Sequence, residues 1–208
     1  MNAQQVQQAL AQLTTETDAT LRNLRLASLV SGVFREAGIE LVVVGGSAIE
    51  FYTEGAYVSG DIDLCLLSPG RLDVRTRQDL MGRLGAKGGP RSWQVAGLYV
   101  DVLGSFETDA RTPVRGIAGP FGELRICPVE ELIVERVLIS VYPGEYPPAR
   151  ECAKKLLAAA LQGEVETDWA EVRRLAQSPA YGDWNEVKEL TDEQAQALKV
   201  RSPYHSDE

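Results

Sequence analysis

The sequence predicts an α+β fold, in which a sheet domain is followed by a helical region. Short apolar segments rich in β-branched residues, which are typical of strands, fall between about residues 40 and 126. After residue 128, apolar residues recur at helical spacing instead. We therefore expect an α+β domain with N-terminal helices over residues 1–127, and a helical region packed on it over residues 128–208.

The elements of the first part are bounded by glycine and proline. Gly38 ends a helix whose leucines and valines recur every three or four residues, and the turn residues Ser68, Pro69 and Gly70 close a strand. The expected elements are helices over 1–15 and 21–34, a strand over 41–44, a helix over 47–52, a strand over 62–67, a helix over 74–84, and hairpins over 93–103 and 114–126.

Helices account for the rest of the chain. Pro128 suits the first turn of a helix that continues with apolar residues to Val137. Thr191, Asp192 and Glu193 have the composition of a helix start. The further helices are expected over 152–161, 168–176 and 191–198.

Composition and charge exclude several classes of protein. The 208 residues carry a formal net charge of −9, which argues against nonspecific binding to nucleic acid or to an anionic membrane. The N-terminal segment lacks the basic start and apolar run of a signal peptide, and no apolar segment approaches the roughly 20 residues that span a bilayer. We therefore expect a cytoplasmic protein with no membrane partner.

Cysteine and histidine narrow the chemistry further. The three cysteines follow no C-x-x-C spacing, which favours reduced thiols, and Cys65 is expected in the core because its neighbours are apolar. The one histidine, His205, lies in a polar C-terminal tail. A histidine-based catalytic triad and a histidine-rich zinc site are therefore disfavoured, so any reaction depends on carboxylates, hydroxyls or basic side chains.

Asp61 and Asp63 are the strongest chemical signal in the chain. Within a strand, residues i and i+2 point to the same face about 6.6 Å apart, so the two carboxylates can converge on one cation. Aspartate is poorly suited to strand interiors, and two on one face call for a compensating charge that Mg²⁺ can supply. The alternative is a solvated strand start after Ser59 and Gly60.

Gly45, Gly46 and Ser47 lie between the strand over 41–44 and the helix that follows it. Glycine permits a sharp turn and a close approach to a ligand, and a helix start offers unpaired N–H groups and a partial positive charge. Ser47 can cap that helix or bind a phosphate oxygen. The motif alone also fits a plain strand-to-helix turn, and it gains weight from the aspartates that follow.

A third acid, Asp101, lies between Val100 and Val102 in a later predicted strand. If that strand neighbours the one with Asp61 and Asp63, the three carboxylates form one cluster. The alternative is an edge-strand acid that faces solvent.

Basic residues have two interpretations. The excess of arginine and lysine between residues 71 and 91 can receive a triphosphate or an RNA, or it can be a solvated helix face. Arg136 lies in the otherwise apolar helix after Pro128, where it can bind a phosphate or pair with Glu131 or Glu135.

Taken together, Gly-Gly-Ser, a short helix, Asp-Ile-Asp on a strand and a single aspartate on a later strand resemble the nucleotidyltransferase superfamily typified by DNA polymerase beta. The resemblance covers about residues 40–103 and is strongest to small bacterial proteins of the abortive-infection toxin type. It implies a nucleotidyltransferase-like mixed β-sheet flanked by helices. Those proteins commonly carry an arginine four residues before the first aspartate, where this chain has Tyr57.

The resemblance implies transfer of a nucleoside monophosphate from an NTP, ATP included, to a hydroxyl of RNA, protein or a small molecule. Asp61, Asp63 and Asp101 would bind two Mg²⁺ ions, and Asp101 would help to activate the acceptor hydroxyl. A toxin of a toxin–antitoxin pair, with an antitoxin protein as its partner, is one form of this activity. The nucleotide would be held by Gly45, Gly46, Ser47, Ser59 and Arg136.

Other functions use some of the same residues. A non-catalytic nucleotide- or partner-binding module would keep the fold, but clustered acids repel one another and gain nothing without a metal. A metal-dependent glycosyltransferase also uses a D-x-D strand end, yet it leaves Gly-Gly-Ser and Asp101 unexplained. A haloacid-dehalogenase phosphatase needs an apolar strand that leads into its first aspartate, and here Ser59 and Gly60 precede Asp61.

Overall fold

A computed structural model describes residues 1–67 and 72–205, and the chain forms two compact units. The turn predicted at Ser68, Pro69 and Gly70 lies outside the described residues. The helices of the described part are too short or too polar to cross a bilayer. The sheet unit comprises Met1–Phe51, Val58–Glu107 and Val114–Cys127, and the helical unit comprises Tyr52–Tyr57, Thr108–Pro113 and Pro128–Glu208.

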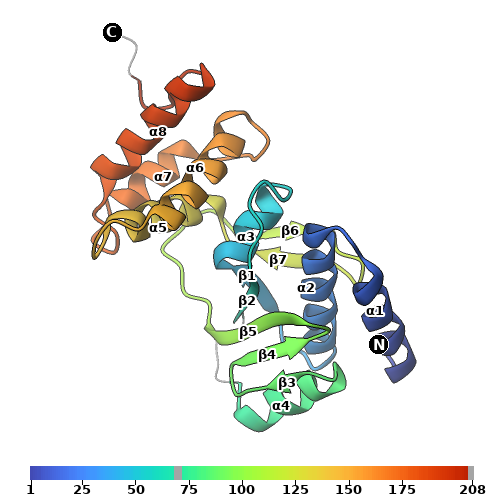
Figure 1. Cartoon of the computed structure of the whole chain (residues 1–208). Coiled ribbons are helices and arrows are strands. Elements are labelled where there is room, and N and C mark those ends of the chain that lie inside the picture. The colour runs from blue at the N-terminus through green and yellow to red at the C-terminus, as the bar shows by residue number, and fades with distance from the viewer. Residues whose placement is uncertain (68–71, 206–208) are drawn as a thin grey trace. The chain divides into compact units, whose positions relative to one another are not determined.

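The sheet unit is built on a mixed sheet, which over the described residues has seven strands in the order β3-β4-β5-β2-β1-β7-β6 (Figure 1). Strand β1 is antiparallel to β2 and parallel to β7, while β2 is parallel to β5. A mixed sheet flanked by helices confirms the predicted fold class. The elements are α1 (Ala3–Thr15), α2 (Ala19–Glu36), β1 (Leu41–Val44), α3 (Gly45–Tyr52), β2 (Asp61–Leu66), α4 (Val74–Arg83), β3 (Lys87–Gly88), β4 (Ser92–Val95), β5 (Leu98–Ser105), β6 (Arg115–Ile117) and β7 (Leu124–Ile126).

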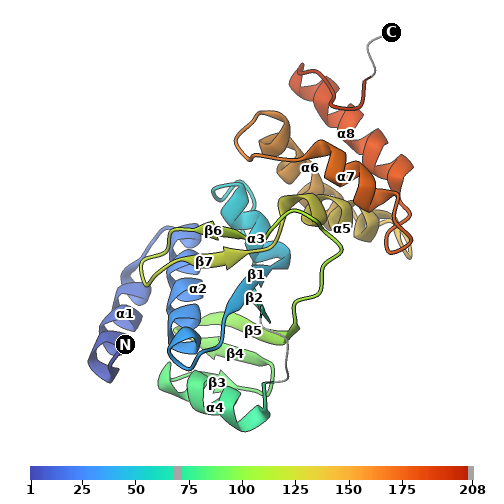
Figure 2. The same cartoon turned by 180° about the vertical axis from the view of Figure 1, so that it is seen from behind.

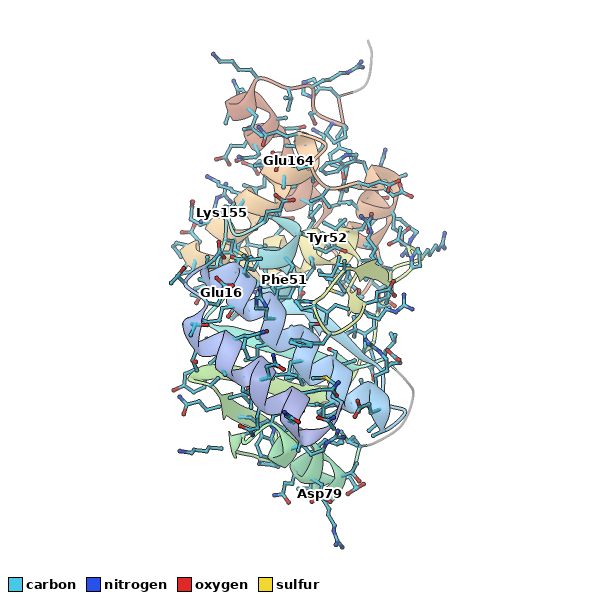
Figure 3. The ribbon with its side chains drawn as sticks, turned by 90° about the vertical axis from the view of Figure 1, so that its right-hand side faces the viewer. Glu16, Phe51, Tyr52, Asp79, Lys155 and Glu164 are labelled. Atoms are coloured by element: carbon cyan, nitrogen blue, oxygen red, sulfur yellow. The ribbon has the colours of Figure 1, made fainter. Side chains whose placement is uncertain are left out.

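Helix α2 supplies much of the core of the sheet unit. Asp18 caps its start by accepting a hydrogen bond from the backbone N–H of Leu21 at 2.9 Å, and Gly38 ends it in a left-handed conformation with φ of 75°. Its fully buried residues include Leu26, Leu29, Val30, Val33 and Phe34, whereas Leu21 in its first turn is exposed. Figure 3 shows α1 and α2 in front of the sheet, so the helical face that the sequence predicted covers one side of it.

The hairpin of β4 and β5 is turned as its sequence predicts. Ala96 and Gly97 both have positive φ, 49° and 83°, which suits the right-handed twist of a two-residue hairpin. Behind this hairpin, the buried Arg77 of α4 donates hydrogen bonds to the carbonyls of Pro90 at 3.1 Å and Leu103 at 3.4 Å. Arg77, one of the basic residues between positions 71 and 91, is therefore a buried structural residue and not part of a solvated helix face.

Three details of the predicted elements were wrong. Helix α3 starts at Gly45, so both glycines belong to its first turn and not to a loop before it. Helix α8 starts at Trp184, and Thr191 lies in its middle, where its hydroxyl donates to the Val187 carbonyl at 2.7 Å. Strand β3 was not predicted, because two residues next to glycines carry no periodic signal.

The helical unit contains α5 (Val129–Val141), α6 (Pro147–Leu161), α7 (Trp169–Ala176) and α8 (Trp184–Leu198) (Figure 2). Pro128 occupies the N-cap position of α5, just before its first turn, and makes no side-chain capping hydrogen bond. The unit also includes Thr108–Pro113, a segment from the connection between β5 and β6.

Three buried glutamates fix that segment to the helices. Glu130 accepts from the Thr112 hydroxyl at 3.0 Å, and Glu171 accepts from the Arg111 N–H at 2.6 Å. Glu131 accepts from the Thr108 hydroxyl, from the Asp109 N–H and from Tyr181. A buried carboxylate is stable only when it is hydrogen-bonded, so these contacts make the segment an integral part of the helical unit.

A fourth buried acid, Asp183, lacks such partners. Only 3% of the residue is exposed, and neither carboxylate oxygen has a hydrogen-bond partner among the described residues. Burial, with a smaller contribution from the nearby charge of Glu186, raises the pKa of Asp183 to about 6. Its charged form therefore destabilises the folded state at neutral pH.

We expect Asp183→Asn to stabilise the protein at pH 7 by up to about 3 kcal/mol, because a pKa about two units above its ordinary value costs that much when the group ionises. The folded pKa is raised, so stability falls as pH rises from about 4 to about 6, and the variant should lose this dependence. Thermal unfolding of both proteins between pH 4 and pH 8 measures the difference. A gap that does not shrink toward pH 4 would contradict this account.

Candidate active site

The three predicted aspartates meet on one face of the sheet. Asp61 and Asp63 lie two residues apart in β2, and Asp101 lies opposite Asp63 in the neighbouring parallel strand β5. Carboxylate oxygens of all three lie within 4.8 Å of one another. The condition set by the sequence, that the strand of Asp101 neighbours the strand of the other two, is met.

The opposite faces of these strands explain why the acids point the same way. Ile62, Leu64, Val100 and Val102 are buried in the core, so the alternate positions must face outward. Asp61 is exposed, and Asp63 and Asp101 are half-buried. The period-2 pattern of the two strands thus determines the direction of every acid in the cluster.

The donor set fits a hard divalent cation. Three carboxylates so close together repel one another, and neither Asp61 nor Asp101 forms a salt bridge with a described residue. Oxygen ligands of this kind are those that Mg²⁺ prefers. Asp61, Asp63 and Asp101 are therefore the residues that would hold the metal.

Ser47 connects the first turn of α3 to the strand of the aspartates. It is fully buried, and its hydroxyl donates to the Val44 carbonyl at 3.0 Å while accepting from the Asp63 N–H at 3.1 Å. Gly45 begins the helix with φ of 61°, a conformation that glycine adopts without strain. The structure therefore brings Gly45, Gly46 and Ser47 next to Asp63, with the serine hydroxyl engaged inside the protein.

A buried glutamate that the sequence did not reveal supports the segment before β2. Glu50 of α3 is fully buried, and its carboxylate accepts from the Asn23 amide at 2.9 Å and from the Ser59 N–H at 3.0 Å. Ser59 in turn donates from its hydroxyl to Asp61 at 3.3 Å. Helices α2 and α3 thus fix the backbone from which Asp61 projects. A glutamate in a short helix normally faces solvent, so only tertiary contacts could have identified it.

Three further residues that the sequence singled out are Arg136, Tyr57 and Cys65. Arg136 belongs to α5 of the helical unit, where its Nε is buried without a hydrogen-bond partner among the described residues. Tyr57 also belongs to the helical unit, and the Lys155 ammonium lies 5.9 Å from its ring centre. Cys65 is half-exposed rather than buried, because it shares the outward face of β2 with the aspartates.

Comparison with known proteins supports the fold. No protein-family model and no curated protein matches the sequence. Among solved structures, an antigenic nucleotidyltransferase-like protein from Paracoccidioides brasiliensis matches with a TM-score of 0.55 at 10% identity, over 82% of this chain and 92% of that one. The antibiotic-resistance factor ANT(2'')-Ia matches with a TM-score of 0.50 at 17% identity, over 76% of this chain and 92% of that one.

Identities this low bear on the backbone and not on the substrate. The match nevertheless extends over most of both chains in each case. It agrees with the mixed sheet that the resemblance in the sequence implied. The chain therefore has the nucleotidyltransferase fold, as the sequence predicts.

Proposed function

We propose that the chain is a Mg²⁺-dependent nucleotidyltransferase that transfers a nucleoside monophosphate from an NTP to a hydroxyl acceptor. The observation that carries the proposal is the cluster of Asp61, Asp63 and Asp101 on adjacent strands of this fold. A divalent cation bound there would polarise the reacting phosphate, help to deprotonate the acceptor and neutralise the leaving pyrophosphate.

The acids have distinct positions for this task. Asp63 is central, since it pairs with Val44 on one side and with Asp101 on the other. Asp101 lies on the strand beyond it, where its carboxylate can accept the proton of an acceptor hydroxyl. Asp61 is the most exposed of the three, and the Ser59 hydroxyl orients its carboxylate.

The first turn of α3 would receive the terminal phosphates. It starts where β1 ends, directly beside Asp63. The first N–H groups of a helix have no partner within it and carry partial positive charge, which favours an anion. Because the Ser47 hydroxyl is engaged by Val44 and Asp63, we assign the phosphate contacts to backbone N–H groups of residues 45–47.

Other parts of the expected function stay predictions from the sequence. These are the binding of ATP as one of the NTPs, the action as a toxin with an antitoxin partner, the cytoplasmic location and the part of Arg136 in nucleotide binding. Within the site itself, the three aspartates are the feature that separates an active enzyme from a binding module, since clustered acids gain nothing without a metal.

We expect Asp63→Asn to lower label transfer from an NTP roughly 10²- to 10⁴-fold, because bound metal supplies several kcal/mol of charge stabilisation. The assay uses each labelled NTP with Mg²⁺ and bulk RNA or bulk protein as acceptor. Asp79→Asn is the matched control, since Asp79 is an exposed aspartate of the same unit on α4 (Figure 3). Absence of transfer with every NTP and acceptor, or equal transfer by Asp63→Asn, would overturn the proposal.

We expect Glu50→Ala to lower the free energy of unfolding by about 2–4 kcal/mol, because the Asn23 amide and the Ser59 N–H would each lose a buried acceptor. Urea unfolding measures the change. Glu54→Ala removes an exposed glutamate just after the same helix and should be nearly neutral. Equal unfolding midpoints for the two variants would show that Glu50 does not support this segment.

A further inference from the structure

A row of exposed side chains continues outward from the aspartates to the edge of the sheet. Asp61 is opposite Tyr99 of β5, Tyr99 is opposite Gln94 of β4, and Gln94 is opposite Lys87 of β3. Residues directly opposite one another in a sheet point to the same face. With strands about 4.8 Å apart, the row extends about 14 Å from the metal cluster.

Every member of this exposed row (Asp61, Tyr99, Gln94 and Lys87) faces solvent in the sheet unit. All four are exposed, and Tyr99 is 58% exposed, which is high for a large aromatic residue. The neighbouring residues on the opposite face, such as Trp93 and Val100, are buried. The fold therefore buries one face of these strands and leaves the row open.

Beyond Asp61, the polar side chains of the exposed row are not engaged in interactions with the described part of the protein. Among the described residues, the Tyr99 hydroxyl and the Gln94 amide have no hydrogen-bond partner, and Lys87 forms no salt bridge. In a chain with a net charge of −9, an unpaired cation in the same row as an exposed aromatic ring favours an anionic ligand that carries flat rings.

We propose that the exposed row binds the acceptor, and that the acceptor is the end of a single-stranded RNA. The inference rests on the proposed function, because it places the terminal hydroxyl at Asp101 and the strand along the row. The Tyr99 ring would stack on a base, the Gln94 amide would bond a base edge or ribose, and Lys87 would contact a phosphate.

This chemistry fits a single strand better than other acceptors. Aromatic stacking accepts any base that is unpaired, whereas the bases of a duplex are already stacked. Small molecules favour concave sites, and this row lies on an open sheet face. A protein acceptor would need a larger apolar centre than one tyrosine provides.

The test is fluorescence anisotropy with a labelled single-stranded RNA in excess Mg²⁺. We expect Tyr99→Ala to raise the Kd roughly 5- to 100-fold, which corresponds to the loss of one base stack. Lys87→Ala should weaken binding and reduce the salt dependence of log Kd by about 0.7, as expected for one lost phosphate contact. A duplex of the same sequence should bind more weakly than the single strand.

Two variants serve as matched controls. Tyr142→Ala removes an even more exposed tyrosine in the helical unit, and Arg75→Ala removes an exposed cation from α4 in the sheet unit. Both should leave the Kd unchanged. Equal affinity of Tyr99→Ala and wild type, or no binding of RNA by the wild type, would overturn the inference.

The outcomes separate this inference from the proposed function. Label transfer to protein or to a small molecule, without RNA binding, would overturn the proposal that the exposed row binds RNA. It would leave the proposed transferase activity standing. Binding of RNA that depends on Tyr99, with no transfer from any NTP, would overturn the proposed transferase activity. It would leave the proposal that the exposed row binds RNA standing.

Discussion

The parallel pairing of β2 with β5 is the constraint on which the candidate site depends. It places Asp63 opposite Asp101 and Asp61 opposite Tyr99, and a shift of one residue would turn either set toward the core. Buried valines, leucine and isoleucine on the other face hold that register. Burial of the apolar side chains on one face of the strands thus offsets the electrostatic repulsion among the three carboxylates on the other face. A bound cation would reduce that repulsion further.

Polar groups buried around the cluster complete the support. Glu50 and Ser47 are fully buried, and each bonds the backbone at or just before β2, through the N–H groups of Ser59 and Asp63. Such contacts fix the positions from which the carboxylates project, which a metal site requires. The exposed row beyond Asp61 follows from the same register, so one strand pairing determines both the placement of the aspartates and the surface beside them.

Much of the fold and the convergence of the three aspartates could be predicted from the sequence, because they depend on the local spacing of apolar and polar residues. The alternation of apolar and polar residues predicted that Asp61 and Asp63 point to the same face of a strand. The pair Ala96-Gly97 predicted the turn of the hairpin that carries Asp101. Features that depend on tertiary contact could not be predicted. Glu50 looks like any helical glutamate, the glycines look like a loop, and nothing local shows that Thr108–Pro113 joins the helical unit.

The central claim is that Asp61, Asp63 and Asp101 form one divalent-metal site. Anomalous diffraction from crystals soaked with Mn²⁺, an anomalous scatterer that can replace Mg²⁺, tests it most directly. The account predicts an anomalous peak about 2.1 Å from a carboxylate oxygen of each aspartate. A peak elsewhere, or none at this cluster under conditions that support nucleotide binding, would contradict it.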